Sequence, residues 1–217
     1  MKVGIDGVLL GVWASIGNAT QILDIGTGTG LIALMIAQRS KALITAIDIE
    51  ESAVLQAKEN IENSPWFDRV GVKLASLQEF ATSPVERFDV IVSNPPYFVN
   101  SLKTPVRNRT AARHADSLTH EELIVYSIKL LNPTGRICLI LPVAEGMKCA
   151  EFAKSKGLYC SRKVSVYPKP NVEAKRLLLE FKLEEAETTV SELVIEIERH
   201  CYSPEFTALA KDFYLKL

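Results

Sequence analysis

A glycine-rich stretch, LDIGTGTGL, constrains the fold of this chain more than any other feature. It places Gly26, Gly28 and Gly30 between a strand pattern at residues 22–25 and a helical pattern at residues 31–38. Glycines at a strand-to-helix turn allow the backbone to approach a ligand closely and the following helix to pack tightly. The stretch therefore predicts an α/β fold with a ligand site at this turn.

Strand and helix patterns alternate around the turn, from about residue 20 to residue 183. Strands are expected at 22–25, 43–47, 70–74, 88–92, 136–141, 159–167 and 176–183, and helices at 31–38, 52–63, 120–131 and 145–156. Alternation of this kind is typical of a mostly parallel sheet with helices on both faces. The last two strands are expected to form an antiparallel pair. Thr119, with Glu122 three residues later, is expected to open the helix at 120–131 in a capping box. We expect one domain over residues 1–217, with a C-terminal strand and helix extension at 184–217 that packs on the sheet.

Two acidic residues give the glycine turn a specific chemistry. The spacing of the glycines differs from the dinucleotide fingerprint, and Asp24 would repel a pyrophosphate but can pair with an ammonium group. Asp48 ends the second strand, where a carboxylate accepts hydrogen bonds from ribose hydroxyls. These features favour S-adenosylmethionine, with S-adenosylhomocysteine as product. The cofactor-binding residues expected here are Asp24, Gly26, Gly28, Gly30, Asp48 and Ile49.

The N-terminal stretch KVGIDGVLLG has two interpretations. In one, Gly4 and Gly7 belong to a plain turn and Asp6 is the N-cap of a helix. In the other, residues 1–19 form a segment that caps the cofactor, with Asp6 and the glycine backbone near its methionine end. The sequence alone leaves both open.

A rigid corner, Asn94-Pro95-Pro96-Tyr97, follows the apolar strand at 88–92. In an open α/β sheet ligands lie outside the carboxyl ends of the strands, so this corner is expected to face the cofactor. The Asn94 side-chain oxygen and the Pro95 carbonyl can each accept an N–H of a planar NH2 group, and the prolines fix these acceptors in advance. Tyr97, with Phe98 beside it, offers an aromatic face for a planar substrate. The same residues also form an acceptable turn, which is the alternative interpretation.

Several basic residues are concentrated in one stretch of the chain, although the chain as a whole is nearly neutral. The formal net charge is −1, so any nucleic-acid binding must depend on a local basic region. The run from 103 to 113 contains no acid, and the loop between the last two strands adds one more cation. The basic residues expected to contact a phosphate backbone are Lys103, Arg107, Arg109, Arg113 and Lys169. The alternative is that they are ordinary solvated side chains.

These motifs together resemble the class I amino-group methyltransferases. More closely, KVGIDGVLLGVWA, NPPYF, ARHADSLTHEEL and VYPKPNVEAKRLLLEF are similar to the bacterial family that methylates N6 of adenosine 37 in valine tRNA, and the likeness covers essentially the whole chain. It implies a Rossmann-like fold with a seven-stranded sheet and one antiparallel strand. It also implies that the Asn94 corner acts on adenine, and that Asn94, Gly4 and Asp6 belong to the cofactor site.

The same resemblance extends the cofactor site to the segment after the third strand. There family members often have an acid that binds the cofactor's adenine. This chain has Ser76 and Leu77, so a hydroxyl or a backbone amide is expected in that role. Members usually carry further residues before the Lys-Val-Gly motif, and we expect the chain to be a shortened form.

Other functions are weighed against this one. A glutamine methyltransferase of the release-factor type presents the same NH2 geometry to the corner, but that family usually has a helical domain where only about twenty residues precede the loop here. A DNA adenine methyltransferase needs a target-recognition domain that no spare stretch supplies. A non-catalytic RNA-binding module that keeps a cofactor fold is the third alternative.

Cellular context follows from what the sequence does not contain. No apolar run approaches the length that spans a bilayer, and the N-terminus has no leader pattern, so a cytoplasmic protein without membrane or obligate protein partner is expected. The four cysteines lie far apart without metal-ligand spacing, so we expect reduced, buried thiols and no metal.

Overall fold

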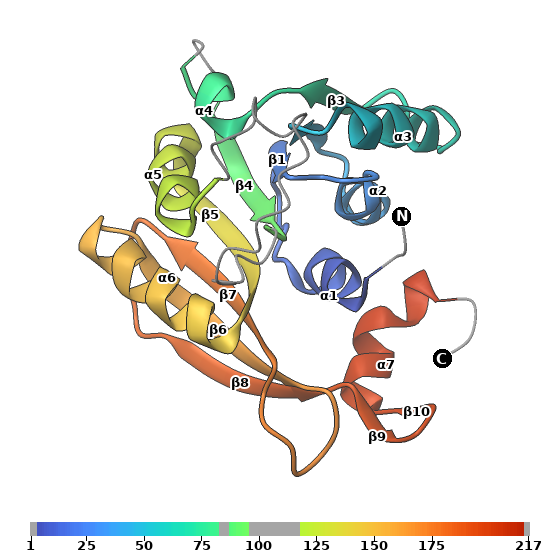
Figure 1. Cartoon of the computed structure of the whole chain (residues 1–217), viewed down its shortest axis with the longest axis vertical. Helices are drawn as coiled ribbons and strands as arrows, with labels where there is room; N and C mark the ends of the chain where they lie inside the picture. Colours follow the sequence, from blue (N-terminus) through green and yellow to red (C-terminus); the bar gives the residue numbers. More distant parts are fainter. Residues whose placement is uncertain (1–3, 83–86, 96–117, 215–217) are drawn as a thin grey trace, which may run out of the picture.

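The computed structural model describes residues 4–82, 87–95 and 118–214 (Figure 1). Its centre is an eight-stranded sheet with the order β3-β2-β1-β4-β5-β7-β6-β8. The strands are β1 (Gln21–Ile25), β2 (Leu43–Asp48), β3 (Val70–Leu74), β4 (Phe88–Ser93), β5 (Leu131–Pro142), β6 (Tyr159–Tyr167), β7 (Arg176–Lys182) and β8 (Thr189–Val194). Of these, β7 alone runs antiparallel to its neighbours. The predicted α/β architecture with one reversed strand is therefore confirmed.

Helices cover both faces of the sheet (Figure 1). They are α1 (Ile5–Trp13), α2 (Leu31–Arg39), α3 (Glu51–Glu62), α4 (Leu77–Phe80), α5 (His120–Leu130), α6 (Val143–Ser155) and α7 (Pro204–Ala210). One face packs against α1, α2 and α7, and the other against α4, α5 and α6. Alternate residues of a strand point to opposite faces, so Ile22 joins the first core and Leu23 the second.

Several local expectations are confirmed. The antiparallel pair β6–β7 forms as predicted. Thr119 opens α5 in a capping box: its side chain accepts from the Glu122 backbone N–H at 3.1 Å, and Glu122 accepts from the Thr119 backbone at 2.9 Å. Among the helices of the described parts, none has the length and apolar character needed to cross a membrane.

Four details differ from expectation. The sheet has eight strands rather than seven, because Thr189–Val194 pairs in parallel with β6. A small hairpin of β9 (Glu196–Glu198) and β10 (Cys201–Tyr202) follows it. The N-cap of α1 is Gly4, and Asp6 lies in the first turn of that helix rather than at the cap. All four cysteines are free, but Cys201 is exposed and Cys160 only half-buried.

The parallel strands β1, β2 and β4 end together at one edge of the sheet. Ile25 of β1 pairs with Ile47 of β2 on one side and with Ser93 of β4 on the other. The glycine turn after β1 and the Asn94 corner after β4 therefore leave the sheet side by side. We refer to this as the carboxyl edge.

Candidate active site

A cavity of about 580 Å³ opens at the carboxyl edge. Its size lies within the range usual for small-molecule and cofactor sites. The glycine turn contributes Gly26 and Gly28, the end of β2 contributes Asp48 and Ile49, and the corner after β4 contributes Asn94 and Pro95. Three sequence motifs that are far apart along the chain thus form one site.

The glycine turn exposes its backbone to this cavity. Gly26 and Gly28 have φ angles of 70° and 58°, a left-handed conformation that favours glycine. The backbone N–H of Gly26 donates to the Ile47 carbonyl at 2.9 Å, which fixes the turn against the end of β2. Gly30 belongs to the same turn but serves as the N-cap of α2 and does not line the cavity.

Asp48 is held in the cavity wall by two backbone donors. Its Oδ2 accepts from the Gly28 N–H at 2.8 Å, and its Oδ1 accepts from the Glu50 N–H at 3.0 Å. Each carboxylate oxygen has a second lone pair, so both oxygens can still accept from a pair of vicinal hydroxyls. Asp48 therefore fits the ribose-binding role expected from the sequence.

Asp24 lies beneath the glycine turn rather than in the cavity lining. Its side chain is fully buried, and its Oδ2 accepts from Thr27 Oγ1 at 2.6 Å and from the Ala33 N–H at 3.2 Å. Its Oδ1 has no hydrogen-bond partner among the described residues. Burial raises the pKa of Asp24 to about 7, against the lowering effect of the two hydrogen bonds, and the nearby charge of Asp48 adds a smaller increase. This incompletely paired carboxyl group fits a cationic ligand group.

Ser76 and Leu77 lie at the cavity wall formed by the short helix α4. Ser76 is the N-cap of α4 in a second capping box: its Oγ donates to Glu79 Oε2 at 2.8 Å and accepts from the Glu79 N–H at 3.1 Å. The hydroxyl proton is thus already used. Of the two donors expected from the sequence, the backbone amide at Leu77 is the better one for the cofactor's adenine.

The corner after β4 is tied to the glycine turn through the preceding residue. Ser93 is buried, and its Oγ donates to the Ile25 carbonyl at 2.8 Å. This bond joins the ends of β4 and β1, so Asn94 and Pro95 enter the cavity at a fixed distance from the glycine turn. Pro96, Tyr97, Phe98, Lys103, Arg107, Arg109 and Arg113 lie outside the described residues.

Three other predicted residues lie away from the cavity lining. Gly4 and Asp6 lie at the start of α1, where Asp6 forms an ion pair with Arg176. Lys169, in the loop between β6 and β7, lies 3.7 Å from Glu196 of β9. Their proposed roles stay predictions.

Several residues that line the cavity were not predicted from the sequence, among them Glu50, Ser52, Gln78 and Leu118. Glu50 and Ser52 follow the strand that ends at Asp48, so their position after a carboxyl end was a usable signal. Gln78 and Leu118 lie beside helix caps, and no periodic pattern distinguishes them.

Comparisons with known proteins agree with this geometry. The methyltransferase domain family matches residues 16–188. A relative from Parabacteroides distasonis is 51% identical over 100% of this chain and 92% of its own length, and one from Trichodesmium erythraeum is 46% identical with the same coverage. Both are named tRNA1(Val) (adenine(37)-N6)-methyltransferase. The chain belongs to this methyltransferase family. The resemblance identified from the sequence is thereby confirmed, and so is the assignment to S-adenosylmethionine-dependent enzymes.

Solved structures of more distant proteins share the fold of this methyltransferase. A predicted O-methyltransferase from Agrobacterium tumefaciens has a TM-score of 0.74 at 20% identity and covers 95% of both chains. An N-methyltransferase from Bradyrhizobium japonicum has a TM-score of 0.57 at 19% identity and covers 82% of this chain and 93% of its own. These likenesses confirm the class I methyltransferase fold.

Proposed function

We propose that this methyltransferase transfers a methyl group to the exocyclic N6 amine of adenosine in tRNA, at position 37 of valine tRNA. The observation that carries the proposal is that Asn94 and Pro95 line the same cavity as the glycine turn and Asp48. This placement supports an acceptor for a planar NH2 group beside a cofactor site. Full-length relatives that carry this activity in their names support the choice of substrate.

The residues of the cavity suit each part of S-adenosylmethionine. Asp48 would accept hydrogen bonds from the ribose hydroxyls, and the Leu77 backbone amide would donate to the adenine. Asp24 Oδ1, which has no hydrogen-bond partner among the described residues, would pair with the ammonium group. When bound, the cofactor supplies an electrophilic methyl group. Gly4 and the other residues of the predicted capping segment are proposed to lie near the methionine end of the cofactor, with Asp6 holding the first turn of that segment in place.

Asn94 and Pro95 would prepare the substrate for attack. An exocyclic amine is a poor nucleophile because its lone pair is delocalised into the ring. Two fixed acceptors, the Asn94 side-chain oxygen and the Pro95 carbonyl, bind its two N–H groups and direct the lone pair towards the methyl donor. Pro96 would keep the corner rigid, and Tyr97 and Phe98 would stack on the extruded base.

Binding of the tRNA is proposed to depend on the basic run after the corner. Lys103, Arg107, Arg109 and Arg113 would contact phosphates next to the target adenosine, with Lys169 as a further contact. Such contacts weaken as salt increases. A tRNA substrate also agrees with the cytoplasmic location expected from the sequence.

The test is transfer of labelled methyl groups from S-adenosylmethionine into total tRNA, followed by nucleoside analysis, with a release factor assayed in parallel. We expect N6-methyladenosine in tRNA. Asn94→Ala should lower the rate at least about 100-fold, because fixed acceptors act mainly in the transition state. Its affinity for S-adenosylhomocysteine should stay within about twofold, since pure transition-state groups add little to ground-state binding.

A matched control is Asn63→Ala, at the exposed C-terminal end of α3 and outside the cavity. It should transfer methyl groups like the unaltered protein. Label in a glutamine of the release factor would favour the protein-methyltransferase alternative. An Asn94→Ala variant with full activity would contradict the proposed role of the corner.

A further inference from the structure

The start of helix α1 is held by an ion pair between two residues that lie 170 positions apart in the sequence. Asp6 Oδ2 lies 2.9 Å from Nε of Arg176, and the two side chains are only 15% and 28% exposed. The Nη1 of Arg176 also donates to the Lys175 carbonyl at 2.9 Å. A partly buried, hydrogen-bonded pair of this kind is screened less by solvent than a surface pair.

The ion pair lies at the carboxyl edge of the sheet. Arg176 is the first residue of β7 and pairs with Pro142, the last residue of β5. Ser93, which precedes the catalytic corner, pairs with Leu139 of β5. Arg176 is therefore two strands from Ser93, about 10 Å across the sheet, and three residues further towards the carboxyl side. The ion pair and the corner occupy neighbouring parts of one edge.

The start of α1 also touches the helix that follows the glycine turn. A Cβ placed on Gly7 would lie 3.2 Å from Cδ2 of Leu31, and one on Gly11 would lie 2.8 Å from Sδ of Met35. The two helices thus pack closely, and a methyl group added at either glycine would require the neighbouring side chain to shift. Leu31 is the first residue of α2, so the first turn of α1 packs beside the residue that follows the glycine turn. Asp6 belongs to that first turn, and its carboxylate reaches Arg176.

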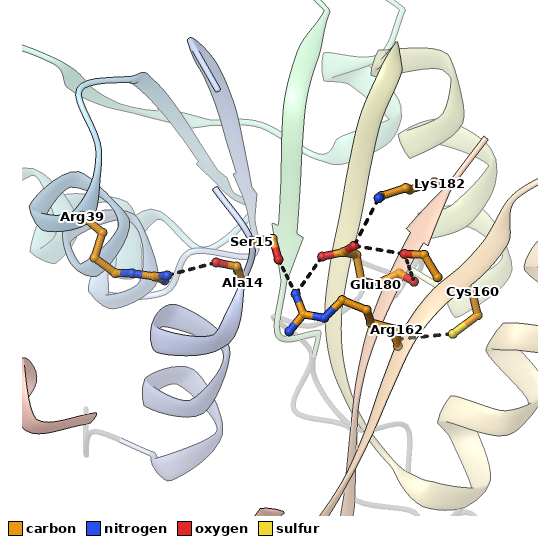
Figure 2. A network of polar contacts seen from close by, with 8 residues as sticks. Ala14, Ser15, Arg39, Cys160, Arg162, Glu180 and Lys182 are labelled. Atoms are coloured by element: carbon orange, nitrogen blue, oxygen red, sulfur yellow. Dashed lines mark hydrogen bonds and ion pairs between the residues drawn. The ribbon is translucent and has the colours of Figure 1, made fainter. Parts of the chain in front are cut away.

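The other end of α1 is fastened independently (Figure 2). Arg162 of β6 donates to Ser15 Oγ, lies 3.2 Å from Glu180 Oε2, and stacks 4.6 Å above the ring of Trp13. Arg39 of α2 donates to the carbonyls of Gly11 and Ala14 at 2.6 and 3.2 Å. These contacts would hold the helix in place if the ion pair at its start were removed. The effect of that removal should then be largest in the first turn.

We propose that Asp6 and Arg176 form a positioning pair that holds the first turn of α1 at the carboxyl edge, beside the start of α2 that follows the glycine turn. The pair acts on methyl transfer through the position of that turn. Small displacements of groups around a reacting centre cost large factors in rate, because the reacting atoms leave their productive alignment. This inference rests on the proposed methyl transfer, assigns Arg176 to it as a further residue and gives Asp6 a positioning role.

A double-mutant cycle tests the pair. Asp6→Asn and Arg176→Met should each lower kcat about 10-fold or more, as expected for loss of alignment, and the double variant should be no slower than the slower single variant. Arg176→Lys keeps the cation and should recover part of kcat. The affinity for S-adenosylhomocysteine, measured by calorimetry, should stay within about threefold for all of them.

Each other result contradicts the proposal in a recognisable way. If Asp6→Asn alone weakens S-adenosylhomocysteine binding more than about tenfold, Asp6 binds the cofactor directly. If Arg176→Met alone raises KM for tRNA, Arg176 is a substrate contact without need of Asp6. If the effects of the two substitutions on kcat multiply, the residues do not act as a unit.

Arg162→Met is the control at the opposite end of α1. It should lower the unfolding midpoint more than Asp6→Asn does, while kcat below that midpoint changes less than about threefold. An equal loss of kcat would show that any loosening of α1 slows transfer, against a specific role for the ion pair. If the unaltered protein methylates an acceptor other than tRNA, the same cycle is run with that acceptor, so failure of the proposed substrate is distinguished from failure of the positioning pair.

Discussion

Strands β1 and β7 each carry one buried carboxylate, and the two carboxylates differ in the groups that surround them. Glu180 on β7 is 1% exposed and is surrounded by partners: Arg162 Nη1 at 3.2 Å, Lys182 Nζ at 3.8 Å and Ser161 Oγ at 3.0 Å (Figure 2). Asp24 on β1 is fully buried and accepts only from Thr27 and Ala33. Within the described ranges no cation forms an ion pair with Asp24, and one of its oxygens has no partner.

The difference agrees with a structural role for Glu180 and with the ligand-binding role proposed for Asp24. A buried charge is tolerated when cations and donors surround it, and it is costly when they do not. Glu180 is satisfied by the protein itself. Asp24 is not, and its raised pKa of about 7 reflects that cost. Among the described residues no group pairs with the second oxygen of Asp24. A cationic group of a bound cofactor would supply that partner.

Of the changes that test this comparison of two carboxylates, removing the charge of Asp24 should have the largest effect. Asp24→Asn should weaken S-adenosylhomocysteine binding about 10- to 100-fold, because a hydrogen bond to a charged group contributes about 1.5–3 kcal/mol. Binding of 5′-methylthioadenosine, which lacks the amino-acid group, should not change. Calorimetric titration of both ligands checks this. Equal weakening of the two ligands would show that the substitution disturbs the glycine turn instead.

A smaller effect should appear as the pH is lowered. Below about pH 7 the Asp24 carboxyl group of the ligand-free protein is protonated, and binding of an ammonium group must displace that proton. The affinity for S-adenosylhomocysteine should therefore fall as the pH decreases, by at most about tenfold per pH unit. Titrations in buffers with different ionisation heats should detect the released proton near pH 6, about one unit below the pKa. Proton release that persists in Asp24→Asn would assign it to another group.

The stability of the ligand-free protein should change with pH in the opposite sense. The folded pKa of Asp24 is about 7 and its ordinary value is 3.8, so its contribution to the free energy of unfolding is fully present below 3.8 and is lost as the pH rises through 7. Urea unfolding of Asp24→Asn and of the unaltered protein across this range measures that contribution.

The smallest effect should come from Glu180. Glu180→Gln should lower the free energy of unfolding by about 1–2 kcal/mol, less than for a fully buried pair, because the side chains of Arg162 and Lys182 are 35% and 37% exposed and regain water. S-adenosylhomocysteine affinity should not change. Urea denaturation and calorimetry check the two statements, and a marked loss of affinity would remove the distinction between the two carboxylates.

Local patterns predicted the parts of the site that depend on neighbours in sequence. The glycine turn, Asp48 at the end of β2, and Asn94 after β4 all lie at the cavity, as strand ends and turn residues indicated. The Thr119 capping box was also readable, since its partner is three residues away. Predictions of this kind were confirmed because the features depend only on the local geometry of neighbouring residues.

The remaining features depend on contacts that no local pattern contains. Asp6 and Arg176 meet across 170 positions. β8 was not predicted as a strand of the main sheet because four of its six residues are exposed, so it shows no alternation of apolar and polar positions. Ser76 was interpreted as a ligand contact alone, whereas its hydroxyl also caps α4. The periodicity of apolar residues and the spacing of motifs do not predict contacts between distant residues, nor a second role of one side chain.

The packing of α1 against α7 has a consequence for how the protein is made (Figure 1). Val8 and Phe206 belong to the same core, and Gln38 of α2 donates to the Asp212 carbonyl at 3.1 Å. On a ribosome roughly 190 residues are added between the two helices, which takes on the order of 10–40 s. Throughout that interval part of the apolar face of α1 has no final partner, and Arg176 is added only late. Helix α1 is synthesised early and secured late, so cotranslational folding of this enzyme should reach an active form only after α7 has left the ribosome.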